Sequence, residues 1–443
     1  MLNREEILET PLQAGSSILA ALEEYGLPQG DPDPEKDLQI LLSAAAEIEH
    51  GLLVQYLYAA YTCTDRTIAG VVRPIATEEM AHFVSVQNLL LAANAPPYLG
   101  RYDKAPRDFD PFPFSLEPMT KEVLAKYAAC EMPDDKSVPD AFKDVMPQLL
   151  ADATASAGNM RPHKVGLLYA KIYWLFRSSD DPLVDPSQEP WPDYPFEEVL
   201  RDVGKNHHVA KYPAKDISGI QVNPGVWQAT NPDLIVATIA TREDALRMIA
   251  SIAGQGEGFP NLPNSHFERF VGAYRSAKKI GTISRPALRD PWYAQSGSKG
   301  RPESEVTSNV AIEFSILGDR LYEILLLAIG LSLHPDSNYD LPKRSLVAST
   351  TIDMMRMCIK PFVRGLSSLP ARARTDSPKL TLCFNLPSMD LNAAQAHARL
   401  LSGMDEALRR ARALQQRNDI SADMQAAAGD VGDYIQQNSA DLG

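Results

Sequence analysis

The chain has 443 residues, of which 44% are hydrophobic and 23% charged, and its formal net charge is −14 at pH 7. A chain of this length and composition can bury full-sized cores, so it is neither fibrous nor disordered as a whole. The acidic balance and the lack of a dense basic run argue against nucleic acid and anionic lipid as partners.

The first residues and the cysteines predict a cytoplasmic chain with reduced thiols. The N-terminus, MLNREEILET, is charged, and the longest apolar run, 324–331, is far shorter than the roughly 18 residues of a membrane span. We therefore expect a cytoplasmic protein with no membrane attachment. The four cysteines are widely scattered without C-x-x-C spacing, which argues against a disulfide framework and a thiolate metal site.

The first half of the chain predicts long helices separated by proline-rich connections. Pro74 predicts a kink or a first-turn position. The proline-rich segment 96–118 is expected to wrap over the bundle surface in an ordered way, and the connection 181–231 is expected to be a long crossover. The helices are expected at 36–64, 66–95, about 160–177 and about 241–258.

The second half follows a polar, glycine-rich segment at 295–302. A short strand-like piece is expected at 380–385, and the tail beyond Gln416 reads as a loose helix. The chain is therefore predicted to be mainly α, with a four-helix bundle in residues 1–295 and an additional C-terminal helical region, 303–443, that packs on the bundle. The helices of that region are expected at 304–332, 345–366 and 391–416.

The second predicted helix carries an acid and an imidazole on its inward stripe. Glu79 and His82 alternate with apolar residues at spacings of three and four, so both point into the bundle core. Burying an unpaired carboxylate costs several kcal/mol, so Glu79 needs a cation, a donor or a proton. An isolated Glu-x-x-His is more often a buried ion pair than a metal site. It indicates a metal site only if the other helices also turn polar residues inward.

The first helix supplies a matching carboxylate. Glu49 lies on one stripe with Leu52 and Tyr56, and it is therefore the inward acid. Glu47 and His50 repeat the Glu-x-x-His spelling on a more polar face, where a solvated pair is the expected interpretation.

The fourth helix ends at Glu257 in the segment QGEG and restarts at SHFERF. Ser265 and Glu268 have the spacing of a capping box, which explains Glu268 without a metal. His266 could return beside Glu257 or could simply be a structural histidine at a helix start.

These residues resemble a known family. The segments EIEHGLLVQYLYAAY, EEMAH, IASIAGQGEG with SHFERF, and MMRMCIKPFVRGLSSLP are similar to the ferritin-like family, including the ferritin-like region of the iminophenyl-pyruvate dimer synthases of bis-indole pigment biosynthesis. The resemblance covers about residues 35–370 and implies a ferritin-like bundle that binds one or two transition-metal ions, iron or manganese. The implied ligands are Glu49, Glu79, His82, Glu257 and His266.

One position departs from that pattern. Where relatives carry a third-helix glutamate, this sequence has Leu167, which cannot bind a metal. His163, one turn earlier, could substitute, water or substrate could fill the gap, or a single ion could be held. The metal and the number of ions stay open at this point.

The resemblance and the inward Glu/His set favour a non-haem iron oxidase or oxygenase. Its partners would be dioxygen and a small, amino-acid-derived metabolite of a biosynthetic pathway, and the chain could form a homodimer. The alternative is a non-catalytic metal-binding or iron-storage protein, and a third possibility is a degenerate scaffold without metal. Three aromatic residues, Tyr56, Tyr169 and Trp174, could line a substrate pocket, although plain core packing is the commoner role. Arg73 and Arg269 could bind a substrate carboxylate, with surface pairing as the default.

Overall fold

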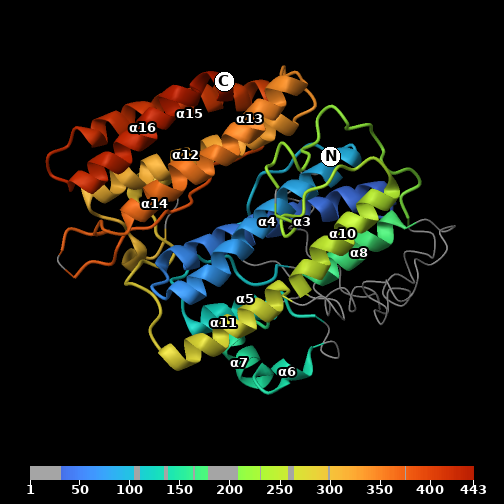
Figure 1. Cartoon of the computed structure of the whole chain (residues 1–443), viewed down its shortest axis with the longest axis horizontal. Helices are drawn as coiled ribbons and strands as arrows, with labels where there is room; N and C mark the ends of the chain where they lie inside the picture. Colours follow the sequence, from blue (N-terminus) through green and yellow to red (C-terminus); the bar gives the residue numbers. More distant parts are fainter. Residues whose placement is uncertain are drawn as a thin grey trace.

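The computed structural model consists of helices joined by long irregular segments (Figure 1). It describes residues 31–103, 110–133, 138–162, 165–177, 208–229, 231–257, 264–297, 300–374 and 376–443, without the side chains of Leu167 and Glu257. No helix in these ranges is both long and apolar enough to cross a membrane. The helices of the first part are α3 (Pro34–Thr62), α4 (Arg66–Ala92), α5 (Lys121–Cys130), α6 (Asp140–Lys143), α7 (Met146–Ser156), α8 (Gly166–Phe176), α10 (Arg242–Glu257) and α11 (His266–Ile280).

The longest helices of the bundle are α3 and α4, which pack on each other along their length (Figure 1). Asp33 caps α3 by accepting from the Glu35 N–H, and Asp65 caps α4 by accepting from the Ile68 N–H. Pro74 lies inside α4 and does not end it. Both expected helices are therefore confirmed.

The third bundle helix is broken into α5 and α8. The N–H of Val165, just before α8, donates to the carbonyl of Cys130, the last residue of α5, at 3.1 Å. This bond continues the helical ladder across a 34-residue excursion, 131–164, that contains α6 and α7. The expected helix at 160–177 is found as α8, whereas α5 and α7 were not predicted.

The fourth bundle helix is likewise divided, into α10 and α11. Helix α10 packs on α8, and α11 packs on α5 and α4. Ser265 caps α11 by accepting from the Glu268 N–H at 3.2 Å, as the capping-box spacing predicted. The two broken helices thus meet as two pairs, which places their ends at the middle of the bundle (Figure 1).

Two buried amides on α4 hold the irregular connections against the bundle. Gln87 exchanges hydrogen bonds with the backbone of Tyr98 at 2.7 and 2.9 Å. Asn88 bonds the backbone N–H and carbonyl of Val222 at 3.0 and 2.7 Å. These contacts satisfy buried backbone groups of segments that form no helix. The described parts of the connections, up to 103, from 110 and from 208, are irregular as expected.

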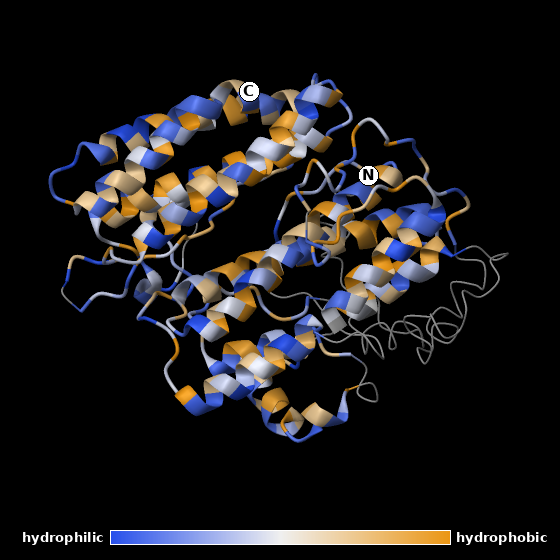
Figure 2. Cartoon of the chain, viewed as in Figure 1, coloured by the Kyte–Doolittle hydropathy of each residue, from blue (hydrophilic) through white to orange (hydrophobic). Residues whose placement is uncertain are grey.

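The C-terminal region forms a second layer of helices (Figure 1). Helix α15 (Ala393–Gln415) has a buried stripe that recurs every three or four residues at Leu400, Met404, Ala407 and Ala411. Elsewhere α15 and α16 (Ala422–Leu442) carry hydrophilic residues (Figure 2). The tail is a full helix, α16. The helices are α12 (Asn309–Leu333), α13 (Leu341–Asp353), a π-helical turn (Met354–Ile359), α14 (Lys360–Leu366), α15 (Ala393–Gln415) and α16 (Ala422–Leu442).

The expected strand at 380–385 is wrong. Within the described ranges only isolated bridges occur, such as Ala287 with Lys379, and 380–385 is extended chain without a ladder. Its apolar residues are buried against helices, which explains the strand-like pattern. The chain is mainly α, as predicted.

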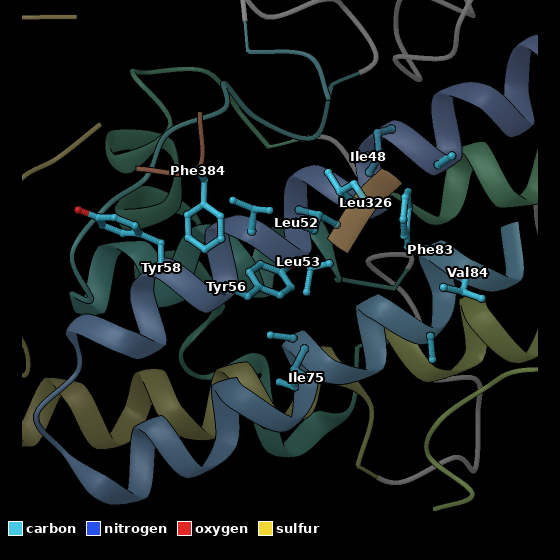
Figure 3. Close-up of a cluster of buried hydrophobic side chains, with 14 of the residues drawn as sticks. Ile48, Leu52, Leu53, Tyr56, Tyr58, Ile75, Phe83, Val84, Leu326 and Phe384 are labelled. Atoms are coloured by element: carbon cyan, nitrogen blue, oxygen red, sulfur yellow. The ribbon is translucent and has the colours of Figure 1, made fainter. Parts of the chain in front are cut away.

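One continuous core joins the two regions. Leu326 of α12 and Phe384 lie among Leu52 and Leu53 of α3 in the same buried cluster (Figure 3). The division at 295–303 stays a prediction from sequence.

This contact corrects the interpretation of Glu47 and His50, which were expected to be solvated. Their exposed fractions are 5% and 0%. The Nδ1 of His50 lies 3.0 Å from the Gly100 carbonyl, and its Nε2 meets the hydroxyl of Tyr322 on α12. The C-terminal region and the first connection cover this face of α3. The residue pattern of α3 alone does not predict that this face is buried.

Candidate metal centre

Five buried polar side chains meet where the four bundle helices come together. Glu49 comes from the middle of α3, and Glu79 and His82 from the middle of α4. Glu131 is the C-cap residue of α5, and His266 is the first residue of α11. None of the five side chains is more than slightly exposed: each residue has 5% or less of its surface accessible.

Glu79 is the centre of the arrangement because its two oxygens face two different histidines. Its Oε2 lies 2.9 Å from Nδ1 of His82, and its Oε1 lies 2.9 Å from Nδ1 of His266. The two imidazole rings are stacked, with centroids 5.6 Å apart. Glu79 therefore bridges two imidazoles that both present Nδ1 inward.

The two remaining carboxylates flank this core in matching ways. Glu49 turns Oε2 toward Nδ1 of His82 at 3.6 Å, and its Oε1 accepts from the hydroxyl of Tyr169. Glu131 turns Oε2 toward Nδ1 of His266 at 3.9 Å, and its Oε1 accepts from the hydroxyl of Tyr56 at 2.7 Å. Each outer carboxylate thus has one oxygen held by a tyrosine and one directed inward.

The outer nitrogens of the histidines are also occupied. Nε2 of His82 lies 2.8 Å from the amide oxygen of Gln255, whose own amide group donates to the Asp233 carbonyl. Nε2 of His266 lies 2.8 Å from Oε2 of Glu78, which also accepts from Arg269 at 2.5 Å. The amide oxygen of Gln255 and the ionised carboxylate of Glu78 are both acceptors. Nε2 of each histidine therefore carries the proton, and Nδ1 is the nitrogen available to a metal.

Burial and crowding perturb the acid groups. Burial, with the charge of Glu79, raises the pKa of Glu49 to about 7 and that of Glu131 to about 8. Burial alone would raise the pKa of Glu79, but the charges of His266 and His82 outweigh it and hold that pKa below its ordinary range. Burial alone would lower the pKa of His266, yet Glu79 raises it to about 9. Without a cation, protons neutralise this cluster.

The cluster fits a metal better than a set of ion pairs. Glu49 Oε2, Glu79 Oε1 and His266 Nδ1 are buried and directed inward. None of the three makes a hydrogen bond of acceptable geometry, although the last two atoms lie 2.9 Å apart. One ligand atom from each of Glu49, Glu79 and His82 lies within 4.8 Å of the others, and the same holds for Glu79, Glu131 and His266. Carboxylates and imidazoles are the donors that iron and manganese take in helix bundles.

Glu131 is the residue that sequence reasoning missed. It follows the last residue of a short helix, and the helix resumes only at Val165, so no continuous stripe connects it to α8. The sequence feature that could have indicated a buried Glu131 is its spacing of four residues from buried Tyr127, at the end of an apolar run. The third-helix carboxylate that Leu167 could not supply is thus present at another position. Glu78 and Gln255 were also missed. A residue that bonds the outer nitrogen of a histidine need not share its helical face, so residue spacing does not reveal it.

Gly256 on α10 allows Glu131 to occupy this place. A Cβ atom at Gly256 would lie 2.8 Å from Oε2 of Glu131, closer than real Cβ contacts. The first glycine of the QGEG segment therefore allows close packing against the carboxylate.

The other predicted site residues have different positions. Glu257 is the last residue of α10, with its side chain outside the described residues, and His163 lies outside them entirely. Tyr56 and Tyr169 are buried and bonded to the site carboxylates, whereas Trp174 packs on His208 with centroids 5.0 Å apart.

The remaining features lie away from the cluster. Arg269 bonds buried Glu78 instead of pairing at the surface, and Arg73 reaches the Ala60 carbonyl at 3.5 Å. A hollow of about 390 Å³, partly open to solvent, lies against another face of α3 beside Gly51 and Phe114, and none of the five clustered residues lines it. All four cysteines are free, and three of them are buried.

Paired glutamates and histidines buried between four helices define the carboxylate–histidine class of helix bundles. The family model described as Ferritin-like matches residues 42–275, more than half of the chain, and the chain belongs to the ferritin-like family.

A search of curated proteins finds a relative that matches most of this chain. The chain is 25% identical over 385 residues to the 2-imino-3-(indol-3-yl)propanoate dimerase of Chromobacterium violaceum, a match that covers 76% of this chain and 33% of the relative. The chain thus spans about a third of that relative's length. No solved structure gives a significant match.

Proposed function

We propose that this chain is a non-haem iron oxidase or oxygenase that acts on a small, amino-acid-derived molecule. The observation that carries the proposal is the matched set around Glu79, in which two histidines and two outer carboxylates each turn one atom inward. Two half-sites that share one carboxylate suit a pair of ions, each with a histidine of its own. When bound, such ions would supply redox chemistry toward dioxygen.

The protein's own residues would orient the ligands and keep the site dry. Tyr56 and Tyr169 fix the outer carboxylates by holding one oxygen of each, so that the other oxygen stays inward. The burial of all five polar residues excludes bulk water, which protects a reactive centre from side reactions. Glu257, the last residue of α10, is proposed as a further ligand from the family pattern alone.

The substrate class rests on the relative. Its name specifies an imino acid that bears an indole ring. A small, amino-acid-derived substrate for this chain is proposed by that likeness.

The test is anaerobic reconstitution with ferrous iron, followed by metal quantification and exposure to dioxygen. The expected result is about two ions per chain and oxygen uptake that a single substitution, Glu79→Gln, abolishes together with the bound iron. Protein that binds no iron would refute the proposal. A large hollow assembly that loads hundreds of ions would instead establish storage, and sedimentation distinguishes the two.

A further inference from the structure

Among the described residues, the two halves of the metal centre share three kinds of contact and differ in the acceptor behind each histidine. In both halves Glu79 meets Nδ1 of a histidine at 2.9 Å, and an outer carboxylate stands 3.6 or 3.9 Å from the same nitrogen. In both, a tyrosine hydroxyl holds the outer carboxylate. The exception is the acceptor behind each histidine, which is the amide of Gln255 for His82 and the carboxylate of Glu78 for His266.

This exception changes the chemistry of the ligand nitrogen. A carboxylate accepts the Nε2 proton more strongly than an amide oxygen does, because a charged acceptor roughly doubles the strength of the hydrogen bond. The imidazole then gains electron density, and its Nδ1 becomes a better donor to a metal. His266 is therefore the histidine whose Nδ1 gains from a charged acceptor behind it.

Both acceptors are fixed in place, so the difference is built into the fold. Glu78 is 3% exposed, neighbours Glu79 on α4 and is also bonded by Arg269, one turn after His266 on α11. The amide group of Gln255 donates to the Asp233 carbonyl at 2.8 Å, which keeps its oxygen toward His82.

We propose that Glu78 and Gln255 make the two metal positions unequal, with the ion beside His266 bound more tightly than the ion beside His82. Glu78 and Gln255 are positioning residues, because they act through the histidines without touching the metal. The inference rests on the metal centre proposed above and adds an order of loading to it.

The test is titration of the whole protein with cobalt(II), followed by visible absorption under anaerobic conditions. Wild-type protein should bind two ions in two distinct phases. The substitution Glu78→Gln turns the carboxylate into an amide and makes the halves alike, so the tighter phase should weaken by about 10- to 100-fold toward the other. Gln255→Leu should weaken only the weaker phase.

Two controls separate this role from a structural one. The carboxylate of Glu268 lies at the same end of α11 and accepts from the Asn264 N–H. Glu268→Gln removes this charge and should leave both phases unchanged. Arg269→Gln breaks the ion pair but leaves Glu78 charged behind His266, so the tighter phase should persist. Circular dichroism checks that each variant is folded.

The outcomes distinguish the two proposals. Wild-type protein that binds no cobalt refutes the metal centre itself. Two equal phases in the wild type, a folded Glu78→Gln variant with an unchanged tighter phase, or a matching loss in Arg269→Gln would each overturn the inequality while leaving the metal centre standing. If Glu78→Gln does not fold, a Gln255→Leu variant that alters the tighter phase would overturn it.

Discussion

Replacing Gly256 with alanine should damage the metal centre without damaging the fold. The added Cβ would lie 2.8 Å from Oε2 of Glu131, whereas ordinary contact begins at 3.4 Å, so the carboxylate must move by roughly 0.6 Å. Ligand distances in metal sites hold to within about 0.2 Å. The required shift is several times larger than that tolerance.

The fold should tolerate the change because the atom that must move is the end of a flexible side chain. Gly256 is the penultimate residue of α10, where alanine gains less than the roughly 1 kcal/mol of a helix interior, so the free energy of unfolding should change little. Affinity for the ion beside His266 should fall by at least about 10-fold, by analogy with other disturbances of ligand geometry.

The assay combines metal titration with denaturant unfolding. Gly272→Ala is the matched control, since Gly272 is an exposed position of α11 with no atom within 4 Å of the added Cβ. The control lies in the middle of α11, so it should gain helix stability and lose no metal affinity. Unchanged affinity at both ions in a folded Gly256→Ala variant would refute the placement of Glu131 in the site.

Three further results are expected. Glu49, Glu131 and His266, with pKa values raised to about 7, 8 and 9, hold protons in the metal-free protein at pH 6.5, so binding should release protons and affinity should rise toward pH 9. Calorimetry in buffers of different ionisation enthalpy measures the release, and binding without it at pH 6.5 would contradict the arrangement. Burial, helped by the charge of Arg101, lowers the pKa of His50 to about 3, so the unfolded chain takes up a proton below pH 6.5 that the folded chain refuses. The free energy of unfolding should therefore fall between pH 6.5 and 3 by about 5 kcal/mol at most. Urea unfolding should show a smaller loss in His50→Gln, and an identical pH profile in that variant would contradict this assignment. Tyr169→Phe should cost about 1–3 kcal/mol in the same assay, because it leaves a buried oxygen of Glu49 without its donor; unchanged stability would show that this bond contributes nothing.

Helical phase alone located much of the site. Glu49, Glu79 and His82 lie in the middle of uninterrupted helices, where a spacing of three or four fixes which residues share a face. The structure brings these three together with His266, whose capping residue Ser265 was also evident from the sequence. Periodicity succeeds at these positions because the backbone geometry is regular.

The misses share a physical cause, which is dependence on distant chain. The carboxylate of Glu131 belongs to a helix that resumes at Val165 after an excursion, and only the tertiary fold joins the two pieces. The burial of Glu47 and His50 depends on α12 and on the connection near Gly100. A polar helical face looks the same in sequence whether water or another part of the chain covers it.

The broken third and fourth helices also bear on the order of events during synthesis. Glu49 and His266 are separated by more than 200 positions, so the complete ligand set exists only after the chain between them has folded. The entropy cost of closing such long loops must be met before the contacts between their ends can stabilise the fold. Metal ions would therefore enter an assembled bundle late and could not act as a nucleus for its folding.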